Sequence, residues 1–137
     1  MIRSASRLVF VLVLASAAAG AQQIPAGVAG KWEGKAMIGP KDSVVTTSIT
    51  TATSTTKGWT IQFPNRPLLQ GRIVAAGGDS VTVEVGPYES ILRKGQQVTT
   101  STTSHYKGDA STGTFEAKYA NGDVVKGKFT GKRAAAK

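Results

Sequence analysis

The chain has 137 residues, with 17 lysines and arginines against 8 acidic residues and no cysteine. The lack of cysteine excludes a disulfide scaffold and a lipid-anchored lipoprotein. The length fits a single domain with one hydrophobic core, and the excess of positive charge favours anionic partners such as polymers, lipid headgroups or acidic proteins.

Residues 1–21 have the features of a cleavable export signal. Arg3 and Arg7 precede an apolar run, which ends in the small residues Ala19-Gly20-Ala21. The run has about a dozen residues, fewer than the roughly 20 of a membrane-spanning helix, so we expect no stable membrane span. The sequence therefore predicts an exported mature domain, residues 22–137 with a short basic tail, in the periplasm or outside the cell. Nucleic acid is not an expected partner there.

From residue 31 onward, apolar and polar residues alternate with a period of two, which is typical of half-buried β-strands. The first three predicted strands are residues 31–38, the threonine-rich run 43–55 and residues 59–63. In residues 64–70, two prolines cannot donate to a strand ladder, so we expect an irregular connection there.

Two short predicted strands follow, residues 72–76 and 80–85, joined by a tight Gly-Gly-Asp turn. Residues 86–95 admit two interpretations. One is a single helical turn capped by Gly95, since the apolar residues have helical spacing. The interpretation that we prefer is a bulge at Gly86-Pro87, a strand that continues through Leu92 and a turn that ends at Gly95. A second threonine-rich strand, residues 97–106, and a loop at 107–111 come next.

The last predicted hairpin, residues 115–129, contains Asn-Gly, a strong signal for a tight turn. A two-residue loop would bury the lysines of the last strand beside the core aromatics. A three-residue loop that ends at Gly122, in the left-handed conformation, pairs Tyr119 with Asp123 instead. Because a one-residue slip exchanges the two faces of a strand, the apolar pattern predicts this second register. Its inner face consists of Phe115, Ala117, Val125 and Phe129, with Gly127 opposite Phe115.

Eight strands in simple succession predict an all-β, up-and-down antiparallel meander that closes into a small barrel, because closure removes exposed strand edges. Gly30-x-Trp32 in the first strand, with Lys132-Arg133 after the last, resembles the Gly-x-Trp signature of calycin barrels, the lipocalin and avidin-like proteins. The run KGWTIQF is also similar to an avidin-type middle strand. The resemblance implies that Trp32 plugs one barrel end and packs under a basic side chain from the closing strand. It implies a barrel and leaves the ligand open.

Residue types that support catalysis are sparse. His105 is the only histidine, and no cysteine or second histidine completes a usual zinc set, so we expect an exposed residue at a strand end. Glu84 and Glu89 flank the predicted bend, where the densest polar cluster comprises Tyr88, Glu89, Ser90 and Arg93. We interpret this cluster as a surface loop with a Glu89–Arg93 ion pair. The protein is predicted to be no enzyme and to need neither metal nor cofactor.

The leading functional hypothesis is a barrel that binds a small apolar or amphiphilic ligand in its mouth. The candidate ligand-binding residues are Trp59, Phe63, Tyr88, Thr100 and Thr102. Threonines of the long strands, Thr47 and Thr51 included, suit either a polar cavity or a solvent-facing surface. An interior cavity above roughly 300 Å³ would favour this hypothesis, and a filled interior would favour its rival.

The rival hypothesis is an envelope-associated interaction protein, which holds an anionic polymer or a protein partner, or inhibits that partner, through a basic face. Barrel closure places the first strand beside the last, so we expect their outward lysines to be neighbours. The predicted basic patch comprises Lys31, Lys35, Lys126 and Lys128, with Lys118 one strand further. Exposed charges are screened over roughly 8 Å at physiological ionic strength, so such binding should weaken steeply with salt.

Overall fold

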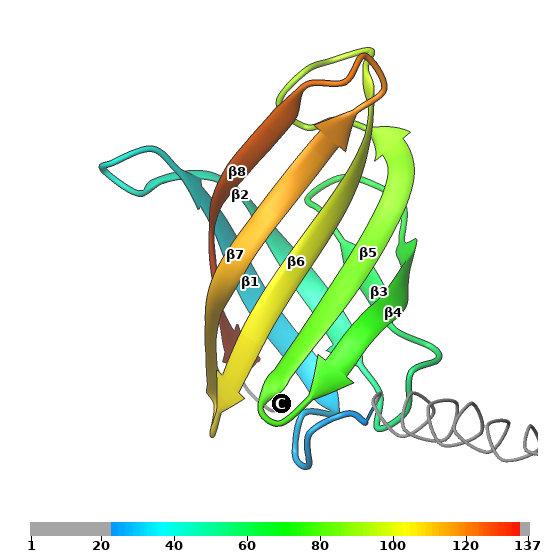
Figure 1. Ribbon diagram of the computed structural model, residues 1–137, viewed down its shortest axis with the longest axis vertical. Helices are drawn as coiled ribbons and strands as arrows, with labels where there is room; N and C mark the ends of the chain where they lie inside the picture. The colour runs from blue at the N-terminus through cyan, green and yellow to red at the C-terminus, as the bar shows by residue number, and fades with distance from the viewer. Residues whose placement is uncertain (1–22, 135–137) are drawn as a thin grey trace, which may run out of the picture.

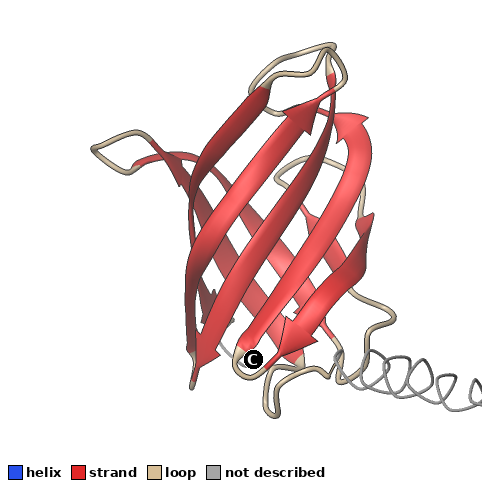
Figure 2. Cartoon of the chain, viewed as in Figure 1, coloured by secondary structure: helices blue, strands red, loops and turns tan. Residues whose placement is uncertain are grey.

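The computed structural model describes residues 23–134, so the predicted export signal, residues 1–21, lies outside the described residues. Eight antiparallel strands follow one another in a meander and form a closed barrel (Figure 1). Residues 23–134 consist of strands, turns and loops and contain no helix (Figure 2). No helix there has the length and apolar character that a membrane crossing requires. The predicted all-β, eight-stranded barrel is confirmed.

The strands alternate in direction, and each pairs with its neighbours in sequence. Their bounds are β1 (Gly30–Ile38), β2 (Ser43–Ala52), β3 (Thr60–Gln62), β4 (Leu69–Gly77), β5 (Ser80–Glu89), β6 (Gln97–Lys107), β7 (Ala110–Tyr119) and β8 (Val124–Arg133). Strand β1 also pairs with β8, so the ladder of hydrogen bonds runs round the whole barrel. Closure of this kind removes most of the unpaired strand edges on which other chains could add. The exception is at β3, which pairs with only three residues of β2 and two of β4.

One end of the barrel is closed by Trp32 of β1. Its side chain is only 3 % exposed, and its Nε1 donates to the carbonyl oxygen of Val28 at 2.8 Å. The Arg133 guanidinium, at the end of β8, lies 4.5 Å from the centroid of the Trp32 ring. The same guanidinium donates to the carbonyl oxygens of Ala29 and Gly27. A tryptophan plug under a basic side chain of the closing strand is therefore present at this end.

Two apolar clusters fill the barrel. The first surrounds the Trp32 plug and contains Val28, Trp32, Ala52, Trp59, Ala76 and Val81. The second lies toward the opposite end and contains Val98, Ala117 and Tyr119, with Tyr88 and Val125 packed against it. The first cluster joins segments from Val28 to Val81, and the second joins the consecutive strands β5 to β8. Side chains of the inner faces thus hold the ring together from within.

The β7–β8 hairpin has the predicted register. The Tyr119 amide donates to the Asp123 carbonyl at 2.8 Å, the Gly122 amide donates to the Tyr119 carbonyl at 2.9 Å, and Gly122 has a φ of 99°. Phe115 pairs with Gly127, where a Cβ atom would lie 2.5 Å from the Phe115 ring. The ring thus covers the bare glycine backbone, and the lysines of β8 point outward.

Several predicted boundaries were wrong. Strand β2 ends at Ala52 and not at 55, because the Thr53 hydroxyl donates to the Lys57 carbonyl at 2.6 Å and organises a loop. Strand β4 starts at Leu69 and not at 72, because the residues after Pro67 have amides that can join the ladder with β3. The connection between β6 and β7 is also shorter than the predicted loop 107–111, since only Gly108 and Asp109 separate the two strands.

Residues 86–95 follow the preferred interpretation only in part. The bulge between Val85 and Tyr88 is present, and so is a turn in which the Gln96 amide donates to the Arg93 carbonyl. The strand ends at Glu89 and does not continue through Leu92. The Ser90 amide still donates to the Gln96 carbonyl at 2.8 Å. Beyond it the chain turns, since the Ser90 Oγ accepts from the amides of the second and third following residues at 3.1 and 3.0 Å. A hydroxyl that bonds to nearby amides competes with strand pairing in this way.

Candidate functional site

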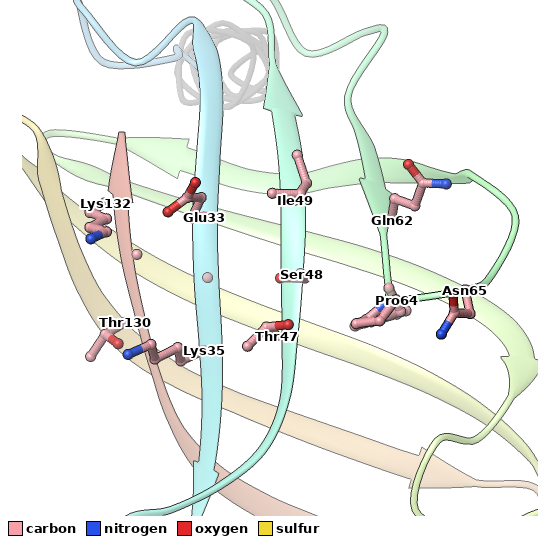
Figure 3. A pocket seen from close by; sticks show the side chains of 13 residues that line it. Glu33, Lys35, Thr47, Ser48, Ile49, Gln62, Pro64, Asn65, Thr130 and Lys132 are labelled. Atoms are coloured by element: carbon pink, nitrogen blue, oxygen red, sulfur yellow. The ribbon is translucent and has the colours of Figure 1, made fainter. Parts of the chain in front are cut away.

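A groove of about 630 Å³ lies on the outside of the barrel, across β8, β1, β2 and β3. Strand register places its side chains in two transverse rows. One row runs Lys132–Glu33–Ile49–Gln62 from β8 to β3. The second runs Thr130–Lys35–Thr47, and Pro64 and Asn65 of the following loop complete the lining (Figure 3). We call this concavity the outer groove.

The floor of the outer groove is a row of small residues between these two rows. Gly131, Gly34 and Ser48 are neighbours across β8, β1 and β2, and their inner sides face the barrel interior. A Cβ atom on Gly34 would lie 2.3 Å from the Phe129 ring, so only glycine leaves room for that ring inside. The Ser48 Oγ is buried and has no hydrogen-bond partner within residues 23–134.

The cations of the outer groove differ from most other lysines of β7 and β8 in having no acidic partner. Lys118 and Lys126 both lie within 4 Å of the Glu116 carboxylate, at 3.8 and 3.6 Å, and Lys128 lies 3.2 Å from Asp42. In the described part of the chain, Lys35 and Lys132 make no such ion pair. These two ammonium groups are exposed and available to an external anion.

The hydroxyl and amide groups of the outer groove are also available. Within residues 23–134 the hydroxyls of Thr47 and Thr130 make no hydrogen bond, and Figure 3 shows them on either side of Lys35. The Gln62 amide nitrogen donates to the Arg66 carbonyl at 3.0 Å, which leaves the amide oxygen free to accept. The outer groove thus combines two cations, two hydroxyls and two amides with one carboxylate, Glu33.

The barrel interior holds a second, much smaller cavity of about 70 Å³ at the end opposite the Trp32 plug. Aromatic rings fill most of the space there, and Phe63 stacks on Tyr88 with ring centroids 5.6 Å apart. The Tyr88 hydroxyl lies 2.7 Å from the Thr100 Oγ1. Burial raises the pKa of Tyr88, and the hydrogen bond with Thr100 opposes part of that rise. The inner space is therefore small, mostly apolar and partly open to solvent.

Residues 90–96, which we call the cover segment, lie over this cavity. The buried Ser90 Oγ is 2.8 Å from the Tyr119 hydroxyl, and Arg66 donates to the backbone carbonyl oxygens of Glu89 and Ser90. The Arg93 guanidinium lies 4.3 Å from the centroid of the Tyr119 ring and 2.8 Å from Asp123. Hydrogen bonds from Arg93 and then Asn121 lower the pKa of Asp123. Polar contacts to β7, the β7–β8 turn and the β3–β4 loop thus hold the cover segment in place.

Of the predicted ligand-binding residues, four line the interior cavity together: Phe63, Tyr88, Thr100 and Thr102. Trp59 does not join them. It is 0 % exposed in the apolar cluster at the plugged end, and its Nε1 donates to the Thr55 carbonyl at 2.8 Å. An indole that is wholly buried with its N–H satisfied has a packing role, so Trp59 is separated from any site in the interior cavity.

The predicted basic patch is only partly assembled. Lys35 lies opposite Thr130 and close to Lys128, as closure of β1 on β8 requires. Lys31 lies at the far end of that ladder, where its carbonyl accepts from the Ala134 amide. Lys126 faces Glu116 across the β7–β8 pair, away from Lys31. The register therefore spreads these lysines along the outer wall and does not gather all of them at one spot.

The candidate catalytic residues do not form one cluster either. His105 is exposed near the end of β6 and lies 3.1 Å from Asp79. The predicted Glu89–Arg93 ion pair is not formed, because Arg93 pairs with Asp123 and the Glu89 carboxylate accepts from the Gly95 amide at 2.9 Å. Glu84 instead pairs with Arg72 at 3.0 Å. No group of three or more histidine, cysteine, aspartate or glutamate residues in the described chain is arranged to hold a metal ion.

Sequence reasoning missed most of the outer groove. The sequence predicts Lys132 only as part of the basic pair after the last strand and Glu33 only as a charge that partly offsets the basic face. Gln62 and Asn65 carry no sequence signal of a binding role. The alternation of outward residues on β1 and β2 was a signal, but the transverse rows exist only once β8 lies beside β1. Their assembly depends on the registers of three strand pairs at once, which no local pattern encodes.

No protein-family model matches the chain, and no curated protein or solved structure is significantly similar to it.

Proposed function

We propose that the protein is an exported, non-enzymatic interaction protein that holds an anionic polymer of the cell envelope on its basic outer face. The contrast between the two concavities supports this proposal. The outer groove offers about 630 Å³ and two unpaired lysines, whereas the interior cavity offers about 70 Å³. Ligand pockets generally have roughly 300 Å³ or more, so the outer wall has room for a partner that the interior, as it stands, does not.

The charge of the chain supports the same proposal. Without residues 1–21, 15 lysines and arginines remain against 8 acidic residues. A field of this sign raises the local concentration of anions at the surface and accelerates their association. Exposed lysines contribute mainly through such long-range attraction, so the interaction is expected to be salt-dependent.

The test is retention of the protein, without residues 1–21, on immobilised dextran sulfate, with neutral dextran as the control matrix. We expect retention on dextran sulfate at low salt, a steep loss as salt rises, and no retention on dextran. Equal retention on both matrices, or retention on dextran sulfate that salt leaves unchanged, would contradict the proposal. Cleavage of the export signal is tested separately by N-terminal mass analysis of the protein isolated from its host.

A second candidate function is the binding of a small apolar ligand inside the barrel. The convergence of Phe63, Tyr88, Thr100 and Thr102 on one apolar cavity favours it. A ligand larger than the cavity would have to displace the cover segment, which Ser90 and Arg93 fasten to Tyr119 and Asp123. A fatty acid or an apolar dye that raises the melting temperature of the parent, and does so less in a Thr102→Phe variant, would support this candidate.

We also propose a calycin-like relationship for the barrel. The support is the start of β1 at Gly30-x-Trp32 together with the Arg133 guanidinium over the Trp32 ring. In calycin barrels the same pairing joins the first strand to the closing strand. An experimental structure in which Arg133 does not cover Trp32 would remove the basis of this proposal.

A further inference from the structure

We propose that the ligand of the outer groove is an acidic saccharide chain, whose carboxylates contact Lys35 and Lys132 and whose hydroxyls contact the threonines and amides. This inference rests on the proposed function and names the class of its partner. Four properties of the outer groove point to such a ligand: its free cations, its uncharged polar groups, its length and its apolar surface.

The free cations select an anion. Lys35 and Lys132 lie on adjacent strands, β1 and β8, and neither has a carboxylate within 4 Å in the described chain, unlike Lys118, Lys126 and Lys128. An unpaired ammonium loses no existing partner when it binds an external carboxylate. Two lysines on adjacent strands can contact anionic groups on successive units of one chain.

The uncharged polar groups select a polyhydroxylated ligand. Thr130 and Thr47 flank Lys35, while Gln62 and Asn65 lie toward the β3 side of the outer groove. Threonine hydroxyls donate and accept, and amides offer both functions side by side, so all four groups can pair with sugar hydroxyls. A polyphosphate has no hydroxyl donors along its chain, so it could accept hydrogen bonds from these four groups but could not donate to them.

The length of the outer groove requires a chain. It crosses four adjacent strands from β8 to β3, and an inter-strand spacing of about 4.8 Å gives about 14 Å across its floor. A single small anion would contact only the lysine end. An extended saccharide reaches from the ammonium groups of β8 and β1 to the amides beyond β2.

The apolar side chains that line the outer groove are Ile49, which is 39 % exposed, Pro64, and Phe63, which is only 8 % exposed. A strip of this size suits the C–H face of a sugar ring. It is too small to bury the acyl chain of a lipid, which requires a continuous apolar channel. The outer groove therefore fits an acidic saccharide better than an anionic lipid.

Glu33 sets where the acidic groups of the ligand can lie. It is opposite Lys132 on one side and Ile49 on the other, so its carboxylate lies between the cationic and the amide ends. A ligand carboxylate placed at the centre of this row would be repelled. Removal of the Glu33 charge should therefore tighten the binding of an acidic saccharide.

The experiment measures the binding of a galacturonic acid hexamer to the protein without residues 1–21, by calorimetry and by amide chemical shifts. The key variant is Lys35→Gln with Lys132→Gln, and the matched control is Lys118→Gln with Lys126→Gln, which removes the same charge outside the outer groove. We expect the key variant to lower the affinity about tenfold or more and the control to lower it about twofold or less. Glu33→Gln should raise the affinity about twofold.

The outcomes separate the two proposals. If the hexamer binds and both double variants weaken it equally, the contact is diffuse and the assignment to the outer groove is overturned while the proposed function stands. Polyphosphate, or vesicles with anionic lipid, binding as tightly as the hexamer and with the same loss in the key variant would overturn the saccharide assignment. If neither dextran sulfate nor the hexamer binds at low salt, the proposed function itself fails. All substituted side chains are exposed, so unchanged melting temperatures confirm that the variants are folded.

Discussion

At Gly122 the β7–β8 turn depends on a single backbone conformation. The residue has a φ of 99°, and an added Cβ atom would have nothing within 4 Å. The cost of a side chain there is therefore conformational and not steric. A substitution at Gly122 therefore tests backbone strain alone, whereas a substitution at most core positions also changes packing.

We predict that Gly122→Val lowers the free energy of unfolding by more than about 1 kcal/mol, because a β-branched residue is forced to positive φ. Urea denaturation of the variant and its parent measures the difference. Gly122→Asn is the control, since asparagine tolerates the left-handed conformation, and it should lose less than the valine variant. A valine variant that unfolds at the parent's urea concentration would show that the turn does not hold the register.

A second residue-scale prediction concerns Tyr106, whose ring meets the Trp32 ring edge to face with centroids 5.0 Å apart. Burial raises the pKa of Tyr106 from 10.0 to about 12, against a smaller opposing effect of its hydrogen bond with Ser104. The unfolded chain loses this proton near pH 10, whereas the folded chain keeps it until about pH 12. The free energy of unfolding should therefore be unaffected below pH 10 and fall as pH rises toward 12.

Tyr106→Phe removes this ionisation, so its stability should fall less than the parent's over that range. Denaturation curves at a series of pH values, together with tyrosinate absorbance, provide the measurement. Equal slopes for parent and variant would show that Tyr106 ionises in the folded protein as readily as in the unfolded chain.

At the scale of elements, the cover segment depends on one hydroxyl. The Ser90 Oγ contacts the Tyr119 hydroxyl and accepts from two amides, and Ser90 is 2 % exposed. We predict that Ser90→Ala destabilises the domain by roughly 1–3 kcal/mol, since it leaves buried polar groups without partners. Tyr119→Phe should cost less, because it leaves the two amide bonds intact. Denaturation of both single variants and the double variant measures their coupling, and an unaffected Ser90→Ala variant would contradict this role.

Some strand registers and boundaries could be predicted from the sequence, and others could not. The β7–β8 register was predictable because an apolar face and an Asn-Gly turn constrained the same hairpin. The ends of β2 and β5 were not, because the side-chain hydroxyls of Thr53 and Ser90 bond to nearby backbone groups and organise turns there. Strands rich in hydroxyl residues carry no signal for which hydroxyl will do so. Four interior residues of the candidate cavity were predictable from alternation. The outer groove was not, since it combines four strands whose relative registers are set by the whole barrel.

At the scale of the whole molecule, Arg133 joins the two ends of the described chain. Its guanidinium covers Trp32 and donates to two carbonyl oxygens before β1, while its partner Asp109 is largely exposed and adds little. We predict that Arg133→Met lowers the free energy of unfolding by about 1–3 kcal/mol, since it keeps the aliphatic stem and removes the cation–π contact and both hydrogen bonds. Asp109→Asn is the control, for which denaturation should show a change below about 0.5 kcal/mol. An Arg133→Met variant as stable as this control would contradict the prediction.

The pairing of β1 with β8 also bears on how long a folded molecule survives. Every other ladder joins strands adjacent in sequence, whereas this one pairs Trp32 with Arg133, 101 positions further along the chain. Such a long-range ladder is costly in entropy to form and is not held by a hairpin, so it should form after, and open before, the long hairpin ladder of β6 and β7. The lifetime of the fold then depends on this seam. Substitutions in it should speed unfolding and leave the folding rate nearly unchanged, and its amides should exchange with solvent before those between β6 and β7.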